Sequence, residues 1–225
     1  MIPRLILCFL AAALLAPAAD NKRAAELWQQ SVTAEASGDY ATAFQNVLDF
    51  KSAGGDTYLA AVRAGWLSYL AKDYEKAIQF YSTAAKTEKK AVTPWLGLAH
   101  TYLAQEKVED VLRATRSGLL IDASNREMLL IAGELTFNKG EYRQAERLFQ
   151  KAVETKPEDP IALSWLGWSL IAQGELKPAA KIFESLMALN PNGYLVSDGY
   201  ALTHGAPGGP GGPGGGPPPG APPRR

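Results

Sequence analysis

Few side chains in this 225-residue sequence are of the types that carry out acid–base, nucleophilic or metal chemistry. His100 and Glu134 form one candidate acid–base or metal pair, but zinc would need a third ligand at suitable spacing. His204 stands beside a glycine- and proline-rich end, and Cys8 is the only cysteine. The sequence has no Ser–His–acid arrangement with a nucleophile elbow and no glycine-rich phosphate loop. We therefore expect no catalytic residue, no metal, no cofactor and no enzymatic activity.

The overall composition is that of a globular protein without an electrostatic attraction for polyanions. Charged residues make up 20% of the chain, hydrophobic residues make up 47%, and the formal net charge is zero. Nucleic-acid-binding domains carry a basic patch or stripe, and nothing of that kind is present. We therefore expect no nucleic-acid partner.

The first 18 residues have the layout of a secretory signal peptide. Arg4 is followed by the apolar stretch 5–15 and by an A-x-A site at residues 16–18, and the stretch is too short to span a bilayer comfortably. Cleavage after this site would leave a short leader, residues 19–23, and a mature chain without cysteine or disulfides. We expect an exported protein, periplasmic or secreted, with no membrane span after cleavage. An uncleaved N-terminal anchor is the alternative, whereas Leu7 argues against a lipoprotein site at Cys8.

A 34-residue repeat runs through the rest of the sequence. The segment NKGEYRQAERLFQKAVETKP, residues 138–157, returns 34 residues later as AQGELKPAAKIFESLMALNP. A small residue early in the unit, a turn in its middle and an alanine after the turn recur at the same interval without an insertion. The register predicts five units: 24–57, 58–91, 92–125, 126–159 and 160–193.

Each unit is predicted to consist of two antiparallel helices. In the fourth unit apolar residues recur at spacings of three and four on both sides of Gly140. Glycine ends the first helix, and Pro157 follows the second. Small residues would let the two helices approach closely, and a late aromatic such as Phe149 would fill the space between one pair and the next.

The period and the residue pattern resemble the tetratricopeptide repeat family over residues 24–193. The residues that match are Trp95, Leu98 and Tyr102 in unit three, and Leu166, Gly167, Ala179, Phe183 and Pro191 in unit five. Two units depart from the pattern: unit one at Ser31 and Val47, and unit three at Val111, Thr115 and Gly118. The resemblance implies an all-α fold, an α-solenoid of five helix–turn–helix units in a right-handed superhelix with a concave face.

In this family the first helix of each unit lines the concave face and holds an extended or helical peptide. The resemblance places a mostly apolar lining, with four of the five tryptophans, at the corresponding positions. The expected partner-binding groove consists of Trp28, Val32, Leu59, Val62, Trp66, Tyr69, Leu96, His100, Leu103, Leu130, Glu134, Phe137, Ile161, Trp165, Trp168 and Ile171. The Lys, Asn and Arg set with which some members grip a C-terminal carboxylate is missing, so we reject that mode.

Two adjacent tryptophans in unit five carry the argument for binding. Apolar residues such as Leu166 and Leu170 already supply the face between the helices, so Trp165 and Trp168 are expected to be surplus to packing. Exposed aromatic side chains of this kind mark interaction surfaces. The alternative is that these aromatics only pack neighbouring repeats.

Two segments follow the last unit. Residues 194–204 form either a short cap or an extended segment, and we expect the extended form because Gly199 interrupts a helical pattern. Residues 205–225 are so rich in glycine and proline that we expect a disordered tail.

The sequence therefore predicts a non-enzymatic protein–protein interaction scaffold in the cell envelope. The partner is expected to be another protein or a peptide segment in the groove. Alternatives are a protein that associates with itself, a groove occupied by its own tail, and a glycan-binding envelope protein.

Overall fold

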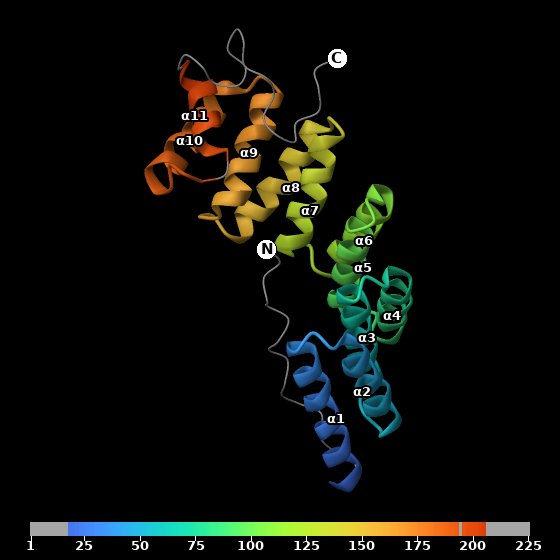
Figure 1. Ribbon diagram of the computed structural model, residues 1–225. Coiled ribbons are helices and arrows are strands. Elements are labelled where there is room, and N and C mark those ends of the chain that lie inside the picture. The colour runs from blue at the N-terminus through green and yellow to red at the C-terminus, as the bar shows by residue number, and fades with distance from the viewer. Residues whose placement is uncertain (1–17, 194, 206–225) are drawn as a thin grey trace. The chain divides into compact units, whose positions relative to one another are not determined.

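The computed structural model describes residues 18–193 and 195–205 (Figure 1). Side chains are described from Lys22 onward. Residues 1–17 of the expected signal peptide and residues 206–225 of the expected tail lie outside the described residues. Within the described ranges the chain forms eleven α-helices and no strand, so the predicted all-α fold is confirmed.

The helices alternate between the two roles that the repeat predicts. The first helices of the five units are α1 (Ala18–Ala36), α3 (Thr57–Leu70), α5 (Thr93–Leu103), α7 (Arg126–Asn138) and α9 (Pro160–Ala172). The second helices are α2 (Tyr40–Ser52), α4 (Tyr74–Thr87), α6 (Val108–Ile121), α8 (Tyr142–Thr155) and α10 (Leu176–Leu189). The two helices of each unit pack against one another. The expected leader, residues 19–23, is not separate from the repeats, because α1 already begins at Ala18.

The turn in the middle of each unit has one backbone geometry. Its first residue is left-handed in all five units, with φ of 80°, 81° and 82° at Gly38, Gly140 and Gly174. Lys72 and Glu106 adopt the same geometry, with φ of 61° and 57°, at a steric cost that glycine avoids. The shared geometry explains why the repeat keeps its register even where the glycine is replaced.

A glycine of the first helix faces an aromatic ring of the second helix in three units. A Cβ atom built on these glycines would lie 2.5–2.9 Å from ring atoms, which is too close for any side chain. The three pairs are Gly65 with Tyr81, Gly133 with Phe149, and Gly167 with Phe183. Helix packing in these units therefore depends on a missing side chain on one helix and a large one on the other.

The same size balance accounts for the two units that depart from the family pattern. At the equivalent positions unit one has Ser31 and Val47, and unit three has Ala99 and Thr115, and all four are buried. A larger residue on the first helix is thus matched by a smaller one on the second. Unit three also has Gly118, where a Cβ atom would lie 2.3 Å from the sulfur of Met128.

The helices form two compact parts of the chain, which divide after Glu88 and which each contain several repeats. They are called the N-terminal unit and the C-terminal unit, as distinct from repeat units one to five. The N-terminal unit contains α1 to α4, and its core cluster is mostly aliphatic, with Leu27, Val47, Leu67 and one buried aromatic residue, Phe50. The C-terminal unit contains α5 to α11, and its largest cluster includes five buried aromatic residues: Phe137, Phe149, Trp165, Trp168 and Phe183. The largest buried cluster of the C-terminal unit is thus richer in aromatic side chains than that of the N-terminal unit.

Residues Val196–His204 form an eleventh helix, α11, which corrects the expected extended segment. Gly199 lies inside this helix and does not interrupt it. The helix packs so closely on Phe183 at this point that a Cβ atom on residue 199 would lie 2.2 Å from the ring. Gly199 also stands one repeat length after Trp165, so α11 takes the place of a first helix after the fifth unit. The lack of a side chain at Gly199 therefore allows α11 to pack on α10.

None of the eleven helices is long and apolar enough to cross a membrane. Among the residues that the structure describes, no group of three or more histidine, cysteine or acidic side chains is arranged to hold a metal ion.

Candidate partner-binding surface

Six of the predicted groove residues lie in the N-terminal unit, on helices α1 and α3. All six are half-buried, so each keeps part of its side chain accessible. We call them the aromatic face: Trp28, Val32, Leu59, Val62, Trp66 and Tyr69. They recur at spacings of three and four along both helices, which places them on one side of each helix.

A charged pair ties the two helices of this face together. The Arg63 guanidinium lies 2.9 Å from the Glu35 carboxylate, and its Nε donates a 2.8 Å hydrogen bond to the hydroxyl of Ser31. Glu35 also accepts a 2.8 Å hydrogen bond from the indole Nε1 of Trp66. One carboxylate of α1 thus fixes both an arginine and a tryptophan of α3.

The rings of the aromatic face are held by contacts on several sides. The Trp28 ring lies 5.1 Å from Phe50, and the Arg63 guanidinium lies 5.2 Å from the same indole. Trp66 stacks on Tyr69 with ring centroids 5.8 Å apart and an angle of 20° between the planes. Rings restrained in this way lose little conformational freedom when a ligand binds.

The titratable groups leave the face without net charge at neutral pH. Burial lowers the pKa of Arg63, which the nearby Glu35 opposes, and a guanidinium stays protonated under these conditions. Burial raises the pKa of the Tyr69 phenol, and Tyr74 adds to the effect, so Tyr69 stays neutral. The face therefore presents uncharged rings around a compensated ion pair, which suits an apolar ligand with few charges of its own.

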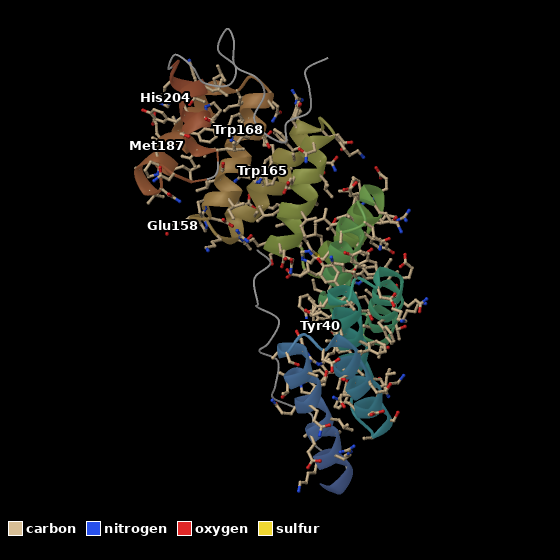
Figure 2. All side chains as sticks on the ribbon, in the orientation of Figure 1. Tyr40, Glu158, Trp165, Trp168, Met187 and His204 are labelled. Atoms are coloured by element: carbon tan, nitrogen blue, oxygen red, sulfur yellow. The ribbon has the colours of Figure 1, made fainter. Side chains whose placement is uncertain are left out.

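Three predicted groove residues of the C-terminal unit are buried. Phe137, Trp165 and Trp168 are only 3%, 8% and 3% exposed. Figure 2 labels the two tryptophans, which both belong to α9. Trp165 stacks on Phe149 at 5.7 Å, and Trp168 meets Phe183 edge-on at 5.8 Å. The expectation that the two tryptophans are surplus to packing is therefore wrong.

The last helix accounts for much of the burial of Trp168. Its indole Nε1 donates a 3.3 Å hydrogen bond to the carbonyl of Leu195, immediately before α11. The segment after the last repeat supplies both a polar partner and apolar cover for this side chain. Sequence reasoning that treated the segment as extended could not anticipate that cover.

The other predicted groove residues of the C-terminal unit remain accessible. Leu96, His100, Leu130 and Ile171 are half-buried, and Glu134 is exposed. Leu103 and Ile161 are large exposed apolar side chains, at 41% and 47%. This part of the predicted groove therefore offers scattered apolar contacts, but no cluster of accessible rings.

The polar pair predicted between His100 and Glu134 is replaced by another one. His100 Nε2 lies 2.8 Å from Glu127 Oε1, nearly two helical turns before Glu134 on α7. The hydrogen bond with His100 lowers the pKa of the Glu127 carboxyl. Glu127 occupies the start of α7, where a carboxylate also stabilises the helix dipole.

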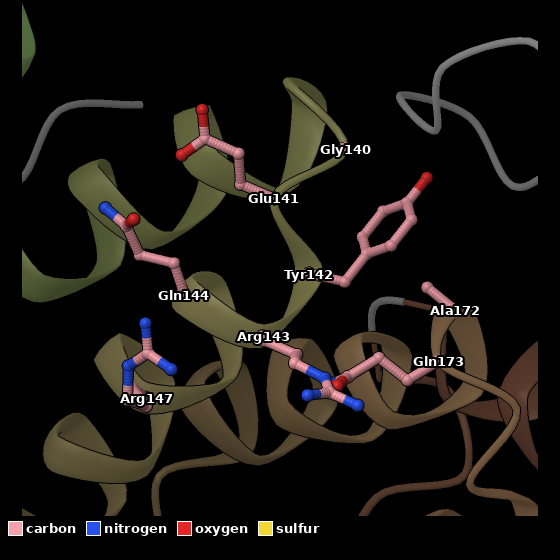
Figure 3. A pocket seen from close by; sticks show the side chains of 8 residues that line it. All are labelled: Gly140, Glu141, Tyr142, Arg143, Gln144, Arg147, Ala172 and Gln173. Carbon is pink, nitrogen blue, oxygen red and sulfur yellow. The ribbon is translucent and has the colours of Figure 1, made fainter.

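A shallow hollow with a volume of about 570 Å³ lies in the C-terminal unit, between the start of α8 and the end of α9 (Figure 3). In Figure 3 the Arg143 and Gln173 side chains point toward one another, while the Arg147 side chain lies apart from them, near Gln144. Its lining is Gly140, Glu141, Tyr142, Arg143, Gln144, Arg147, Ala172 and Gln173. None of these residues belongs to the predicted groove, and the mixed charges give the hollow no single ligand chemistry.

The sequence analysis missed the charged centre of the aromatic face. Ser31 was noticed only as a departure from the family pattern, and Glu35 and Arg63 were not singled out. Arg63 stands in an otherwise apolar stretch of α3, AAVRAGW, and an arginine at such a position needs a nearby anion. That requirement is the signal that could have identified the pair.

The tetratricopeptide repeat family matches residues 137–197, which include all of α8, α9 and α10. The chain is also 23% identical over 122 residues to the Protein CTR9 homolog of Arabidopsis thaliana, a match that covers 54% of the chain and 11% of that protein. The curated relatives are much longer, since the chain spans only 11% to 27% of their lengths.

Solved structures with the same fold include tetratricopeptide repeat proteins. One, from Parabacteroides merdae ATCC 43184, superposes with a TM-score of 0.68 at 19% identity, covering 81% of this chain and 73% of that one. YrrB, described as a tetratricopeptide repeat protein with an unusual peptide-binding site, gives a TM-score of 0.62 at 14% identity, covering 81% and 97%. At identities this low, the superpositions establish a shared fold and nothing more.

Proposed function

Since this chain is a tetratricopeptide repeat protein, we propose that it is a non-enzymatic scaffold that binds a segment of a partner protein on the aromatic face of its N-terminal unit. The observation that carries the proposal is that Trp28, Trp66 and Tyr69 remain partly accessible although three contacts hold them in place. Repeat arrays of this kind present extended surfaces for binding partners.

The binding mechanism would be burial of apolar surface against pre-positioned rings. Interface energy is concentrated in a few residues, and tryptophan, tyrosine and arginine are enriched among them. All three types occur here, and Glu35 joins the Trp66 indole and the Arg63 guanidinium to one carboxylate. No bond would be made or broken.

We further propose that the protein acts in the cell envelope. The support is the signal-peptide layout of residues 1–18. Export would place the aromatic face where other exported proteins or cell-wall polymers are its possible ligands.

Photo-crosslinking in the native cell tests the site. A crosslinking residue replaces Trp66, and a matched variant carries it at Leu120, which is 83% exposed and belongs to α6 of the C-terminal unit. We expect one foreign protein to be captured from position 66, and capture from position 120 to be at least tenfold weaker.

Three results would contradict the proposal. Equal capture from both positions would mean that the contact is nonspecific. Capture of a second copy of the chain would favour self-association. Capture of cell-wall polymer without any protein would favour glycan binding.

A further inference from the structure

We propose that the surface under α11 is a second binding site, for a short amphipathic helix of a partner protein, and that α11 occupies this site as an internal competitor. The surface is formed by α9 and α10 of the C-terminal unit, against which α11 packs (Figure 1). It is separate from the aromatic face, so the inference does not depend on what the aromatic face binds.

The position that α11 covers is one at which a first helix can present a ring to a ligand. Trp168 has the same place in the repeat as Trp66, yet Trp66 is partly accessible and Trp168 is 3% exposed. The difference comes from the segment of α11, because the carbonyl of Leu195 accepts the indole hydrogen of Trp168 and Gly199 lies on the Phe183 ring. Without α11, the edge-on pair of Trp168 and Phe183 would lie at the surface as an apolar patch, which is typical of an interaction site.

The anchoring of α11 is weak enough for exchange. Only two of its nine residues, Val196 and Gly199, are buried. Leu195 at its N-cap makes no side-chain hydrogen bond and has a φ of 55°, a left-handed conformation that is costly for a residue with a side chain. At the other end, His204 is bonded to Glu184, but this contact is exposed to solvent. A nine-residue helix has little stability of its own, so α11 opens when these few contacts are replaced.

The contacts of α11 define the helix that would replace it. The partner helix needs glycine where Gly199 meets Phe183, because a Cβ atom there would lie 2.2 Å from the ring. Three positions earlier it needs an aliphatic side chain in the place of Val196, which is 1% exposed. A backbone carbonyl of its first turn would accept the indole hydrogen of Trp168. Its outward side is free to be polar, as Ser197 is in α11. Helices that bind in apolar grooves have such anchors at spacings of three and four.

The covalent connection of α11 sets a threshold for partners. A segment on the same chain competes at an effective concentration that reaches the millimolar range. The apparent affinity of a partner helix is lowered in proportion to the fraction of chains in which the site is open. A partner helix that is longer or better capped than α11 would therefore displace it, whereas weaker helices would be excluded.

The test uses the full chain with the change Ala201→Pro. Proline inside α11 breaks the helix without adding bulk at the Phe183 contact. The chain is labelled with 5-fluorotryptophan, and the fluorine signals are assigned by single Trp→Phe variants. We expect the Trp168 signal to shift and to become sensitive to a soluble paramagnetic quencher. Trp66 and Trp165 serve as internal controls and should keep their signals, because neither ring contacts α11.

A synthetic peptide of residues 195–205 is the probe for the open site. Added at millimolar concentration to the Ala201→Pro chain, it should return the Trp168 signal to its position in the unaltered chain. The same peptide with Gly199→Leu should bind about tenfold more weakly or worse, because the added side chain meets the Phe183 ring. The unaltered chain should respond to the first peptide about tenfold less than the Ala201→Pro chain, since its own α11 competes.

Three results would overturn the proposal. A Trp168 signal that stays protected in the Ala201→Pro chain would show that α11 does not control access to this ring. Loss of the Trp165 signal as well would show that α11 is an integral part of the core and cannot be exchanged. Equal binding of the two peptides, or no binding of either, would show that the surface does not recognise a helix with glycine at this contact.

Discussion

Trp66 and Trp168 occupy the same position of the 34-residue repeat, three units apart, but their environments differ. Trp66 is half-buried and donates its indole hydrogen to Glu35 of the preceding first helix. Trp168 is 3% exposed and donates the same hydrogen forward, to the backbone before α11. The repeat position fixes the direction of a side chain, and the neighbouring segments decide whether it is available to a ligand.

The positions three residues earlier show the complementary case. Arg63 and Trp165 are also equivalent in the repeat, and both are buried, at 9% and 8% exposure. Burial of the arginine requires the Glu35 and Ser31 partners, whereas the tryptophan packs on aromatic rings such as Phe149. The N-terminal unit therefore uses polar contacts where the C-terminal unit uses aromatic packing.

The largest expected effect is on the C-terminal side of this comparison. Trp168→Ala should lower the free energy of unfolding by about 3–5 kcal/mol, because it removes a buried ring and leaves a cavity. Denaturant unfolding followed by circular dichroism measures the change. Trp66→Ala should cost clearly less, because that ring is only half-buried, and equal losses would remove the distinction between the two tryptophans.

Breaking the ion pair tests the N-terminal side. Glu35→Gln should lower the free energy of unfolding by about 3 kcal/mol, because Arg63 then remains buried without its counter-charge. The double variant Glu35→Gln with Arg63→Met should recover most of the loss, since it removes both charges. A double variant as unstable as the single one would show that the pair is not the source of the effect.

Crowding the contact of the last helix should have a moderate effect. Gly199→Ala places a methyl group against the Phe183 ring and should cost about 1–3 kcal/mol as α11 is displaced. The matched control is Ser197→Ala, an exposed position of the same helix. Hydrogen exchange of α11 amides should speed up in the first variant alone, and unchanged exchange there would contradict the close contact.

The smallest expected effect is a pH dependence of the same helix. A hydrogen bond with Glu184 and one with the Tyr200 carbonyl raise the pKa of His204. A raised pKa means that the contact is fully present below the unfolded value of about 6.5 and is lost as pH rises through the folded value. Exchange at α11 should therefore accelerate slightly above neutrality in the wild type, after correction for intrinsic rates, and His204→Gln should abolish the change.

Much of the fold could be predicted from the sequence, because strictly periodic features encode it. The five helix pairs and the turns beginning at Gly38, Gly140 and Gly174 follow from one interval of 34 residues. Periodicity does not report what happens where the repeats end. Gly199 indicated a break by local propensity, but tertiary contact with Phe183 requires glycine within a helix.

The candidate site was harder to predict than the fold. The repeat register correctly identifies the first-helix positions, but it treats all of them as equivalent. Whether Trp66 or Trp168 is accessible depends on Glu35 and Leu195, which lie outside the helix that carries each tryptophan. Neighbouring segments therefore decide which first-helix residues are accessible and which belong to the core.

The position of α11 has a consequence for engineering. Its register is that of a first helix, so the joint before it is a natural site for lengthening the array. A copy of residues 160–193 inserted directly after residue 193 would meet α10 with the same type of first helix that α10 already accommodates. Because repeat stability is set by nearest neighbours, the added copy would place its Trp165 against Phe183 as the native Trp165 lies against Phe149. Glycine at that position of the copy would instead reproduce the contact that Gly199 makes with Phe183.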